Sequence, residues 1–286
     1  MCWGNFNLIK LSYLLSCGLI VSLFLGQAVA SIQEDGYWDY ATGTLPVPRM
    51  SVNVTGNVHS SGYIFLTTRG AQINRMSTLI YDLEGDLVYQ GPQSVTSNLH
   101  VQTVFGQDML TLWSGHMISI GIGYGAVSML DNTYRRLYTI TLTGHFVTPD
   151  GIQRSSYIDF HESEVTPQNT LLVTAYNVTR ADLTSVGGPE DGWLLDSLFY
   201  DIDIATNRVL FSWSAFDFLK EIPLYTSHHP LSESGKNRSD PWDAYHVNSI
   251  QAVNDGYLIS IRHMWSGIYL YRNGTVKWQL NVSFLS

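Results

Sequence analysis

Imidazole, amide and guanidinium groups gather at the two ends of one segment of the chain. Residues 241–263 have the sequence PWDAYHVNSIQAVNDGYLISIRH, with His246 and Asn248 near its start and Arg262 near its end. Arginine offers a planar fork of hydrogen-bond donors, asparagine an amide donor, and histidine an acid, a base or a nucleophile. These side chains therefore predict a site that binds an anionic group and uses a histidine for proton or group transfer.

Histidine recurs at the start of three similar strand pairs. An apolar strand, a polar turn and a second strand follow His100, His161 and His246, in the segments 98–115, 159–177 and 244–263. An earlier copy, 51–70, keeps only the strands. A single histidine is more often a hydrogen-bonded core or turn residue. Three at equivalent points of a repeat, beside an asparagine and an arginine, favour a functional site where the repeats converge.

A second repeated unit predicts the fold class. Alternation with a period of two dominates the sequence, and helical periodicity is nearly absent outside a short candidate at 216–220. Hairpins with turns rich in Asp, Asn or Gly alternate with the histidine strand pairs, at 79–90, 128–140, 198–213 and 267–280. Four strands per repeat are typical of propeller blades. We predict an all-β fold, a partial β-propeller of three to four blades. A sandwich or jelly roll is the alternative, which explains the strands but not the repeated histidine.

The first thirty residues predict a secretory signal peptide. Lys10 precedes an apolar run over 11–25, and Ala28-Val29-Ala30 is a small-x-small cleavage site. An uncleaved anchor is the alternative. We expect residues 31–286 to form one secreted domain that is free of the membrane once the leader is removed.

The composition of the remaining chain narrows its partners and its chemistry. The whole chain has 15 Lys and Arg and 24 Asp and Glu; removing the leader takes away one Lys, which leaves a net charge of −10. This charge disfavours nucleic acid. Both cysteines, Cys2 and Cys17, lie in the leader, so no disulfide, thiolate nucleophile or cysteine metal site is expected. Five sequons predict glycosylation at Asn53, Asn177, Asn237, Asn273 and Asn281.

Several common active-site signatures are absent from the sequence. It has no G-x-S-x-G, no Walker sequence and no H-E-x-x-H. Paired acids do not occur at the repeated position, which weakens a glycosidase hypothesis. His228-His229 is expected to be solvated in a loop rich in Pro and Ser, and further zinc ligands are not evident. We therefore expect neither a metal site nor a cofactor.

A family resemblance becomes specific at this point. The segments DFHE, SVGGPEDGWLLDSLFYDIDIATNRVLFSW, PWDAYHVNSI and LISIRH, in this order, resemble the fungal secreted branch of the arylsulfotransferase (ASST) family, from about Gly36 to the C-terminus. The resemblance implies a six-bladed propeller. It also implies transfer of a sulfuryl group from a phenolic sulfate ester to another phenol, by a ping-pong route through a sulfated histidine. The expected partners are small aryl sulfates and phenols.

The resemblance also implies roles for four residues. His161 matches the active-site histidine of the family's His-Glu motif, His246 and Asn248 match its His-x-Asn, and Arg262 matches its arginine. Arg262 and Asn248 are expected to bind the sulfuryl oxygens. His161 and His246 are expected to handle the phenol proton or the ester oxygen.

Two departures from the family lead to a further expectation. The family's nucleophilic histidine lies downstream of Ile-x-Arg-His, whereas no histidine follows His263 here. Alternation along a strand would also turn His263 away from the side that Arg262 faces. Relatives often have a histidine where this chain has Tyr124, which is expected to contact the substrate. We therefore expect a C-terminally truncated fragment that lacks ping-pong activity.

Other interpretations of the sequence remain open. The loop 187–193 is either a solvated turn or a wall of the substrate site in which Trp193 stacks on an aryl ring. The main alternative function is a non-catalytic secreted propeller that binds aryl or glycan ligands or a protein. A quinone-dependent propeller oxidoreductase is a third hypothesis, which rests on the repeated hairpins alone.

Overall fold

The structure is a computed structural model that describes residues 37–38, 46–53, 55–56, 61–70, 73 and 75–281. The chain divides into two units, one of residues 1–59 with 84–86 and one of residues 60–83 with 87–286. In the first unit, strands β1 (Tyr37–Trp38) and β2 (Val47–Pro48) pair in an antiparallel manner. The remaining strands belong to the second unit.

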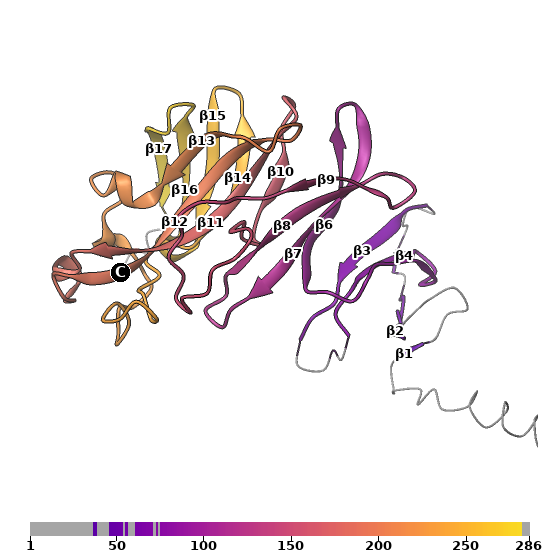
Figure 1. The fold of residues 1–286 in the computed structure, drawn as a ribbon, viewed down its shortest axis with the longest axis horizontal. Helices are drawn as coiled ribbons and strands as arrows, with labels where there is room; N and C mark the ends of the chain where they lie inside the picture. The colour runs from indigo at the N-terminus through magenta and orange to yellow at the C-terminus, as the bar shows by residue number, and fades with distance from the viewer. Residues whose placement is uncertain are drawn as a thin grey trace, which may run out of the picture. The chain divides into compact units, whose positions relative to one another are not determined.

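The second unit contains four antiparallel sheets, and in each of them consecutive strands pair as a meander (Figure 1). The first sheet has three strands: β3 (Tyr63–Thr67), β4 (Thr78–Asp82) and β5 (Leu87–Gln90). The second sheet comprises β6 (Thr96–Val104), β7 (Gln107–Met117), β8 (Gly123–Leu130) and β9 (Arg136–Ile140). The third comprises β10 (Ser163–Val165), β11 (Thr170–Ala181), β12 (Gly192–Asp203) and β13 (Val209–Ser214). The fourth comprises β14 (Val247–Val253), β15 (Gly256–Ile261), β16 (Ser266–Tyr271) and β17 (Val276–Asn281).

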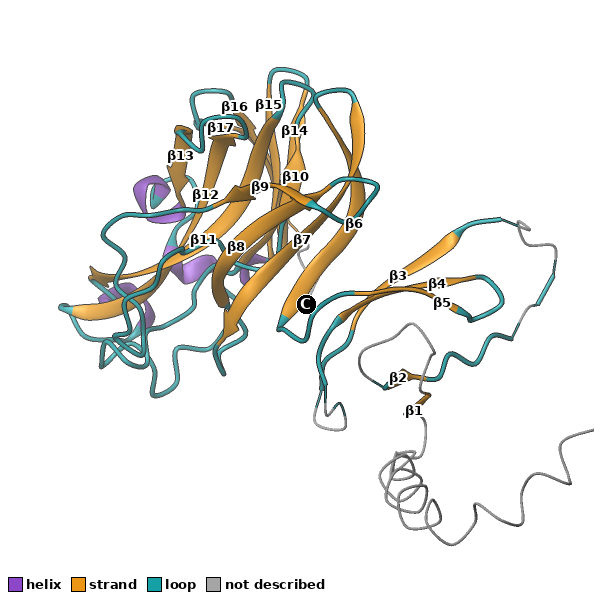
Figure 2. Ribbon diagram, turned by 45° about the vertical axis from the view of Figure 1, so that its right-hand side comes forward, coloured by secondary structure: helices purple, strands orange, loops and turns teal. Residues whose placement is uncertain are grey.

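Helix is confined to short 3₁₀ turns among the described residues (Figure 2). They are η1 (Thr184–Val186), η2 (Ala215–Phe218), η3 (Leu224–Thr226) and η4 (Arg262–Met264). None of the helices within the described ranges is long and apolar enough to cross a membrane. The all-β prediction is confirmed, and the helical candidate at 216–220 corresponds in part to η2.

The predicted strand pairs are confirmed with one exception. All four hairpins form, as β4–β5, β8–β9, β12–β13 and β16–β17, and the three histidine segments form β6–β7, β10–β11 and β14–β15. The copy predicted at 51–70 is wrong in part, because residues 51–53 lie outside any strand and β3 is the one strand among the described residues of this segment. The first sheet therefore has three strands among the described residues.

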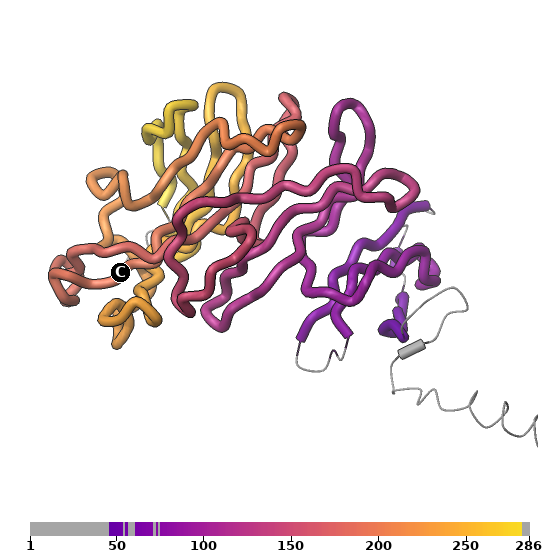
Figure 3. Tube along the Cα trace, in the orientation of Figure 1, coloured from indigo at the N-terminus to yellow at the C-terminus, as the bar shows by residue number. Residues whose placement is uncertain are grey.

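The core lies between successive sheets, whose order along the chain can be followed in Figure 3. β11 is buried over most of its length, because its two faces pack against different partners. Leu171 and Val173 belong to the cluster that also contains Trp113 and Val127 of the second sheet. Leu172 points the other way and belongs to the cluster shared with the fourth sheet. This alternation is what a strand covered on both faces requires.

Asparagines in the turns join neighbouring sheets. Asn169 and Asn254, which both lie eight residues after a histidine of the repeat, have positive φ angles of 59° and 28°. Asparagine tolerates this conformation better than most residues with a β-carbon. The Asn169 side chain also accepts a hydrogen bond from the Phe105 amide at 2.5 Å, which links the β10–β11 turn to the β6–β7 turn.

Gly115 of β7 and Gly125 of β8 lie opposite one another and let the two strands approach closely. A β-carbon on Gly125 would lie 2.2 Å from the Ser114 carbonyl oxygen and 2.7 Å from the Trp113 ring, so alanine at this position would force backbone apart. We expect Gly125→Ala to lower the free energy of unfolding by about 3 kcal/mol, the upper part of the range for overpacking. Urea denaturation measures the change.

Gly267→Ala is the matched control. Gly267 also lies in a strand, and an added β-carbon there would meet nothing within 4 Å. This variant should keep or slightly raise stability. Equal urea midpoints for Gly125→Ala and Gly267→Ala would show that the space between β7 and β8 can accept a β-carbon, against the prediction.

Candidate functional site

The first part of the site is a histidine held by a buried carboxylate. His161 lies just before β10, and its Nδ1 is 2.6 Å from Oδ2 of Asp159, which is fully buried. Asp159 also accepts hydrogen bonds from the amides of Gly123 at 2.7 Å and His161 at 2.8 Å, and from the Thr174 hydroxyl at 3.2 Å. Asp159 therefore anchors the Nδ1 side of the His161 ring, and in the tautomer with its proton on Nδ1 the ring donates that proton to the carboxylate.

Local packing fixes the orientation of the His161 ring. The Asp159 amide donates to the Thr174 carbonyl, which holds the 157–161 segment beside β11. The Phe160 ring stacks on His161 at a centroid distance of 4.3 Å, and the Phe160 carbonyl accepts a hydrogen bond from the Asn98 amide of β6 at 2.8 Å. The second and third sheets together therefore position this imidazole.

The second part of the site is a similar pair of a histidine and an aspartate, just before the first strand of the fourth sheet. His246 precedes β14, is 2% exposed and adopts a positive φ of 58°. Its Nδ1 is 2.5 Å from Oδ2 of Asp243. Its Nε2 lies 3.4 Å from Nε2 of His161, and the two rings cross at 82°. The structure thus brings together two histidines that are 85 residues apart in the sequence.

His263 also faces this cluster, and the expectation that alternation turns it away is wrong. β15 ends at Ile261, and residues 262–264 form the 3₁₀ turn η4, so strand alternation no longer applies there. The His263 Nδ1 is 2.6 Å from the Asp243 carbonyl oxygen, and its ring centroid is 4.9 Å from that of His246. Burial lowers the pKa of the His263 imidazole, and the nearby Asp243 opposes this shift.

His228 and His229 are exposed, as predicted, but they are not simply solvated. The His229 ring stacks on His263 at 4.3 Å, and the His228 ring stacks on Trp265 at 3.9 Å. The His228 amide donates to the His263 carbonyl at 2.7 Å. The loop that carries both histidines therefore supports η4 from outside, and its sequence carried no signal for this contact.

Arg262 and Asn248 flank the cluster. Arg262 follows β15, its side chain is exposed, and its amide donates to the His246 carbonyl at 3.1 Å. Asn248 is half-buried at an irregularity of the β14–β15 ladder between Val247 and Ser249. A bulge of this kind turns a side chain out of the regular alternation.

A buried tyrosine completes the cluster. The Tyr176 ring lies 5.6 Å from His246 and 6.3 Å from His161, and its hydroxyl donates to the Val247 carbonyl at 2.7 Å. Burial, and then the negative charges of the two aspartates, raise the pKa of Tyr176 well above its usual value, while the charge of Arg262 opposes the shift. This phenol therefore stays neutral, and its ring packs against the two imidazoles.

Three other candidates from the sequence have their ring and hydrogen-bond contacts with residues other than the paired histidines. His100 is inside β6 rather than before it; burial lowers its pKa, and a hydrogen bond with the Ser163 backbone opposes this. Tyr124 is 2% exposed, with Arg154 4.6 Å from its ring centre, and burial raises its pKa. The Trp193 ring is covered by Arg180 at 3.9 Å.

The predictions about processing concern other parts of the chain. The signal peptide predicted at 1–30 lies outside the described residues. Four of the predicted glycosylation asparagines are exposed and Asn177 is half-buried; the exposed ones are Asn53, Asn237, Asn273 and Asn281. The side-chain oxygen Oδ1 of Asn177 accepts a hydrogen bond from the Val147 backbone amide at 2.8 Å.

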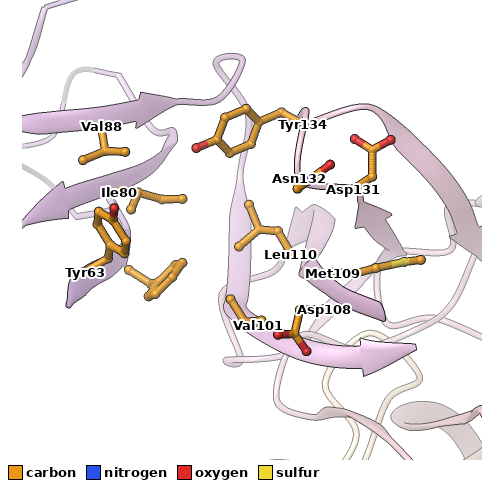
Figure 4. Close-up of a pocket in the computed structure, with 11 residues that line it drawn as sticks. Tyr63, Ile80, Val88, Val101, Asp108, Met109, Leu110, Asp131, Asn132 and Tyr134 are labelled. Carbon is orange, nitrogen blue, oxygen red and sulfur yellow. The ribbon is translucent and has the colours of Figure 1, made fainter. Parts of the chain in front are cut away.

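A hollow of about 460 Å³ lies elsewhere, lined mainly by apolar side chains of the first and second sheets (Figure 4). Tyr63, Ile80 and Val88 line it on one side, and Leu110 and Tyr134 on the other. It contains no histidine. Its shape alone suggests a binding site, whereas the groups capable of acid–base or covalent chemistry gather at His161 and His246.

The two aspartates were not predicted from the sequence, although a signal for them is present there. An acid stands two residues before His161 in DFHE and three residues before His246 in PWDAYH. Acid-histidine spacing of this kind is common by chance, so it becomes informative only when both acids turn back onto their rings. Asp243, His246 and His263 also offer atoms within 4.8 Å of one another that could ligate a metal ion.

The comparison with known families bears directly on this cluster. The sequence profile described as Arylsulfotransferase (ASST) matches residues 100–283, which include every residue of the cluster. The chain belongs to the arylsulfotransferase family. This confirms the resemblance at the level of the family.

Comparisons with individual proteins add little to the family assignment. No curated protein matches the chain. A solved structure of a Bacteroides caccae protein of unknown function matches at 12% identity with a TM-score of 0.40. The match covers 78% of this chain and 59% of that one, so this chain spans little more than half of that protein's length.

Proposed function

We propose that this arylsulfotransferase-family chain transfers sulfuryl groups from aryl sulfate esters to phenols. The observation that carries the proposal is the pair of imidazoles whose Nε2 atoms face one another at 3.4 Å, each with a carboxylate behind it. Such an arrangement orients both rings toward one point, where a reacting group can bind. Arg262 and Asn248 lie next to this point in the chain and in the sheet.

The sheets fit the propeller architecture that we propose for the family domain. Each is a meander in chain order, successive sheets share a core, and His161 and His246 stand immediately before the first strands of the third and fourth sheets. In a propeller, the starts of successive innermost strands converge on one central opening. This architecture explains why two distant histidines meet.

The proposed chemistry assigns each group a step. Arg262 and Asn248 bind the sulfuryl oxygens, on which negative charge is spread in the transition state. His161 and His246 act on the ester oxygen or on the phenol proton. We propose His263 as the carrier, because its Nδ1 donates to the Asp243 carbonyl and its Nε2 therefore holds a lone pair.

The carrier step balances in two displacements. His263 Nε2 forms a bond to sulfur as the bond from sulfur to the aryl oxygen breaks, and the first phenol leaves with that electron pair and takes up a proton. The acceptor phenol then loses a proton and forms the new bond to sulfur as the bond from nitrogen to sulfur breaks. His263 returns to its starting state, and the two proton transfers cancel.

The test is sulfuryl transfer by the purified full chain. With 4-nitrophenyl sulfate as donor and a phenol as acceptor, we expect release of 4-nitrophenol together with the sulfated acceptor, and much less of both from His161→Ala. With the donor alone, mass spectrometry should find a sulfuryl group on the peptide that contains His263. A wild-type rate no higher than that of His161→Ala would exclude the proposed function and favour a protein that only binds its ligands.

A further inference from the structure

The space between the first and second sheets is incompletely filled. The clusters that join the second sheet to the third, and the third to the fourth, each contain many buried side chains. In the described part of the chain, the cluster that joins the first sheet to the second contains three: Ile80, Leu110 and Leu130. The hollow of about 460 Å³ lies beside them (Figure 4). Sites that enclose a small molecule typically have volumes of about 300–1,000 Å³.

Exposed apolar and aromatic side chains gather around this hollow. Tyr63 and Val88 come from the first sheet, Val101 from β6 of the second, and Tyr134 from the β8–β9 turn. Their exposed fractions lie between 41% and 60%, and all four line the same hollow. A contiguous apolar surface of this kind gains free energy when a ring covers it and displaces water.

Tyr134 is held at the hollow in an unusual backbone conformation. Its φ is 62°, in the left-handed region where bulky residues are rare. Its ring stacks on Tyr89 of β5 with 3.9 Å between the centroids and 9° between the planes. Figure 4 shows the Tyr134 ring extending from the β8–β9 turn toward the first sheet. Backbone strain of this kind gathers at ligand sites. The stack fixes one aromatic wall of the hollow before any ligand binds.

The charged groups at the hollow favour a positively charged ligand. Asp131 lines it, but the Asp131 carboxylate already accepts hydrogen bonds from the amides of Thr133 and Arg135 and from the Arg135 guanidinium. Asp108, near the start of β7, accepts a hydrogen bond from the Thr103 hydroxyl at 3.0 Å and has no ion pair among the described residues. No Lys, Arg or His of the described ranges lines the hollow. The Asp108 carboxylate therefore attracts an ammonium group and repels a sulfate ester.

We propose that this hollow is a second binding site, which takes a small aromatic amine. The ring of the ligand lies between the first and second sheets, against Val101 and Tyr134, and its ammonium group faces Asp108. Tyrosine rings at the hollow also suit a cation, because the face of an aromatic ring attracts positive charge. None of the histidines of the candidate functional site lines the hollow. The proposed site is therefore separate from that for sulfuryl transfer and does not depend on it.

Three fluorescent probes that share one ring system test the proposal. Naphthylmethylamine, naphthylmethanol and naphthylacetate differ chiefly in the charge of the head group at neutral pH, and fluorescence anisotropy follows their binding to the full chain. We expect the amine to bind most tightly and the acetate most weakly. Asp108→Asn should weaken binding of the amine about 2–5-fold, the scale of an exposed ion pair, and leave binding of the alcohol unchanged.

A second variant tests the position of the site. Val101→Arg places a long cationic side chain at the hollow and should abolish binding of the amine and the alcohol. Val209→Arg is the matched control and should bind like wild type, because Val209 is also exposed in a strand, β13, but does not line the hollow. Urea denaturation confirms that both variants fold. Wild-type affinity in Val101→Arg would overturn the proposal. So would a wild type that binds no probe, or that binds the amine no more tightly than the alcohol or the acetate.

Discussion

The His246→Asn variant should lose sulfuryl transfer by about 10²–10⁴-fold, the usual contribution of a positioned acid–base group. His246 is buried between His161, Asp243 and Tyr176, and its Nε2 lies 3.4 Å from that of His161. Asparagine is chosen because residue 246 has a φ of 58°, which asparagine tolerates. Steady-state rates with an aryl sulfate donor, combined with urea denaturation to confirm folding, measure the effect.

His100→Ala is the informative comparison for this variant. In the sequence His100 shares the repeated position of His246 without its family motif; in the structure it lies within β6 and its ring is hydrogen-bonded to the Ser163 backbone. We therefore expect the His100 variant to keep transfer within a few-fold of wild type. A loss as large as that of the His246 variant would mean that the site extends along the first strands, and that the paired imidazoles are not its centre.

Asp196→Asn should make the protein less sensitive to pH and more stable near neutrality. Asp196 lies in β12 with 5% exposure, and burial raises its pKa from 3.8 to about 7, against the hydrogen bonds from Ser214 Oγ and the Phe216 amide. The folded protein therefore holds a proton there that the unfolded chain releases. Stability from this group is full below its unfolded pKa and is lost as pH rises through the folded pKa.

The size of this loss of stability follows from the shift in the pKa of Asp196 on folding. At 1.36 kcal/mol per pKa unit, wild type should lose up to about 4 kcal/mol from this group between roughly pH 4 and pH 7. The asparagine variant should lack this part of the pH dependence. Urea denaturation across this pH range compares the two proteins.

The control for this prediction is Asp182→Asn. Hydrogen bonds from Thr184 lower the pKa of Asp182, which is exposed. The Asp182 carboxyl therefore titrates below the range from about pH 4 to pH 7. Its variant should follow the wild-type curve from about pH 4 to pH 7. Identical curves for wild type and Asp196→Asn would mean that Asp196 is ionised in the folded protein.

The strand pairs could be predicted from sequence because hairpins are local. In 198–213 and 267–280 the apolar residues alternate on either side of a turn residue with a positive φ, Asn207 or Gly274, and these features lie within a few positions of one another. The prediction failed at 51–70, where residues 51–53 make no strand. A short apolar stretch is ambiguous unless a partner strand is there to accept its hydrogen bonds.

The site could be predicted only in part. His161, His246, Asn248 and Arg262 were identifiable from motifs in a set order, and the structure brings the two histidines into contact. The direction of His263 was not predictable, because a strand that ends one residue earlier changes which side its ring faces. The pairing of each imidazole with an aspartate depends on backbone turns at 159–161 and 243–246 that carry no periodic signal.

The sequence by itself determined the class of fold, the order of the strand pairs and the side-chain types available for chemistry, since alternation and turn residues act over short distances along the chain. Only the tertiary structure decided that Nε2 of His161 meets Nε2 of His246 with a carboxylate behind each ring. That contact spans 85 residues and depends on how the third and fourth sheets pack through a common core. Contacts of this range come from the packing of whole sheets, which no local pattern encodes.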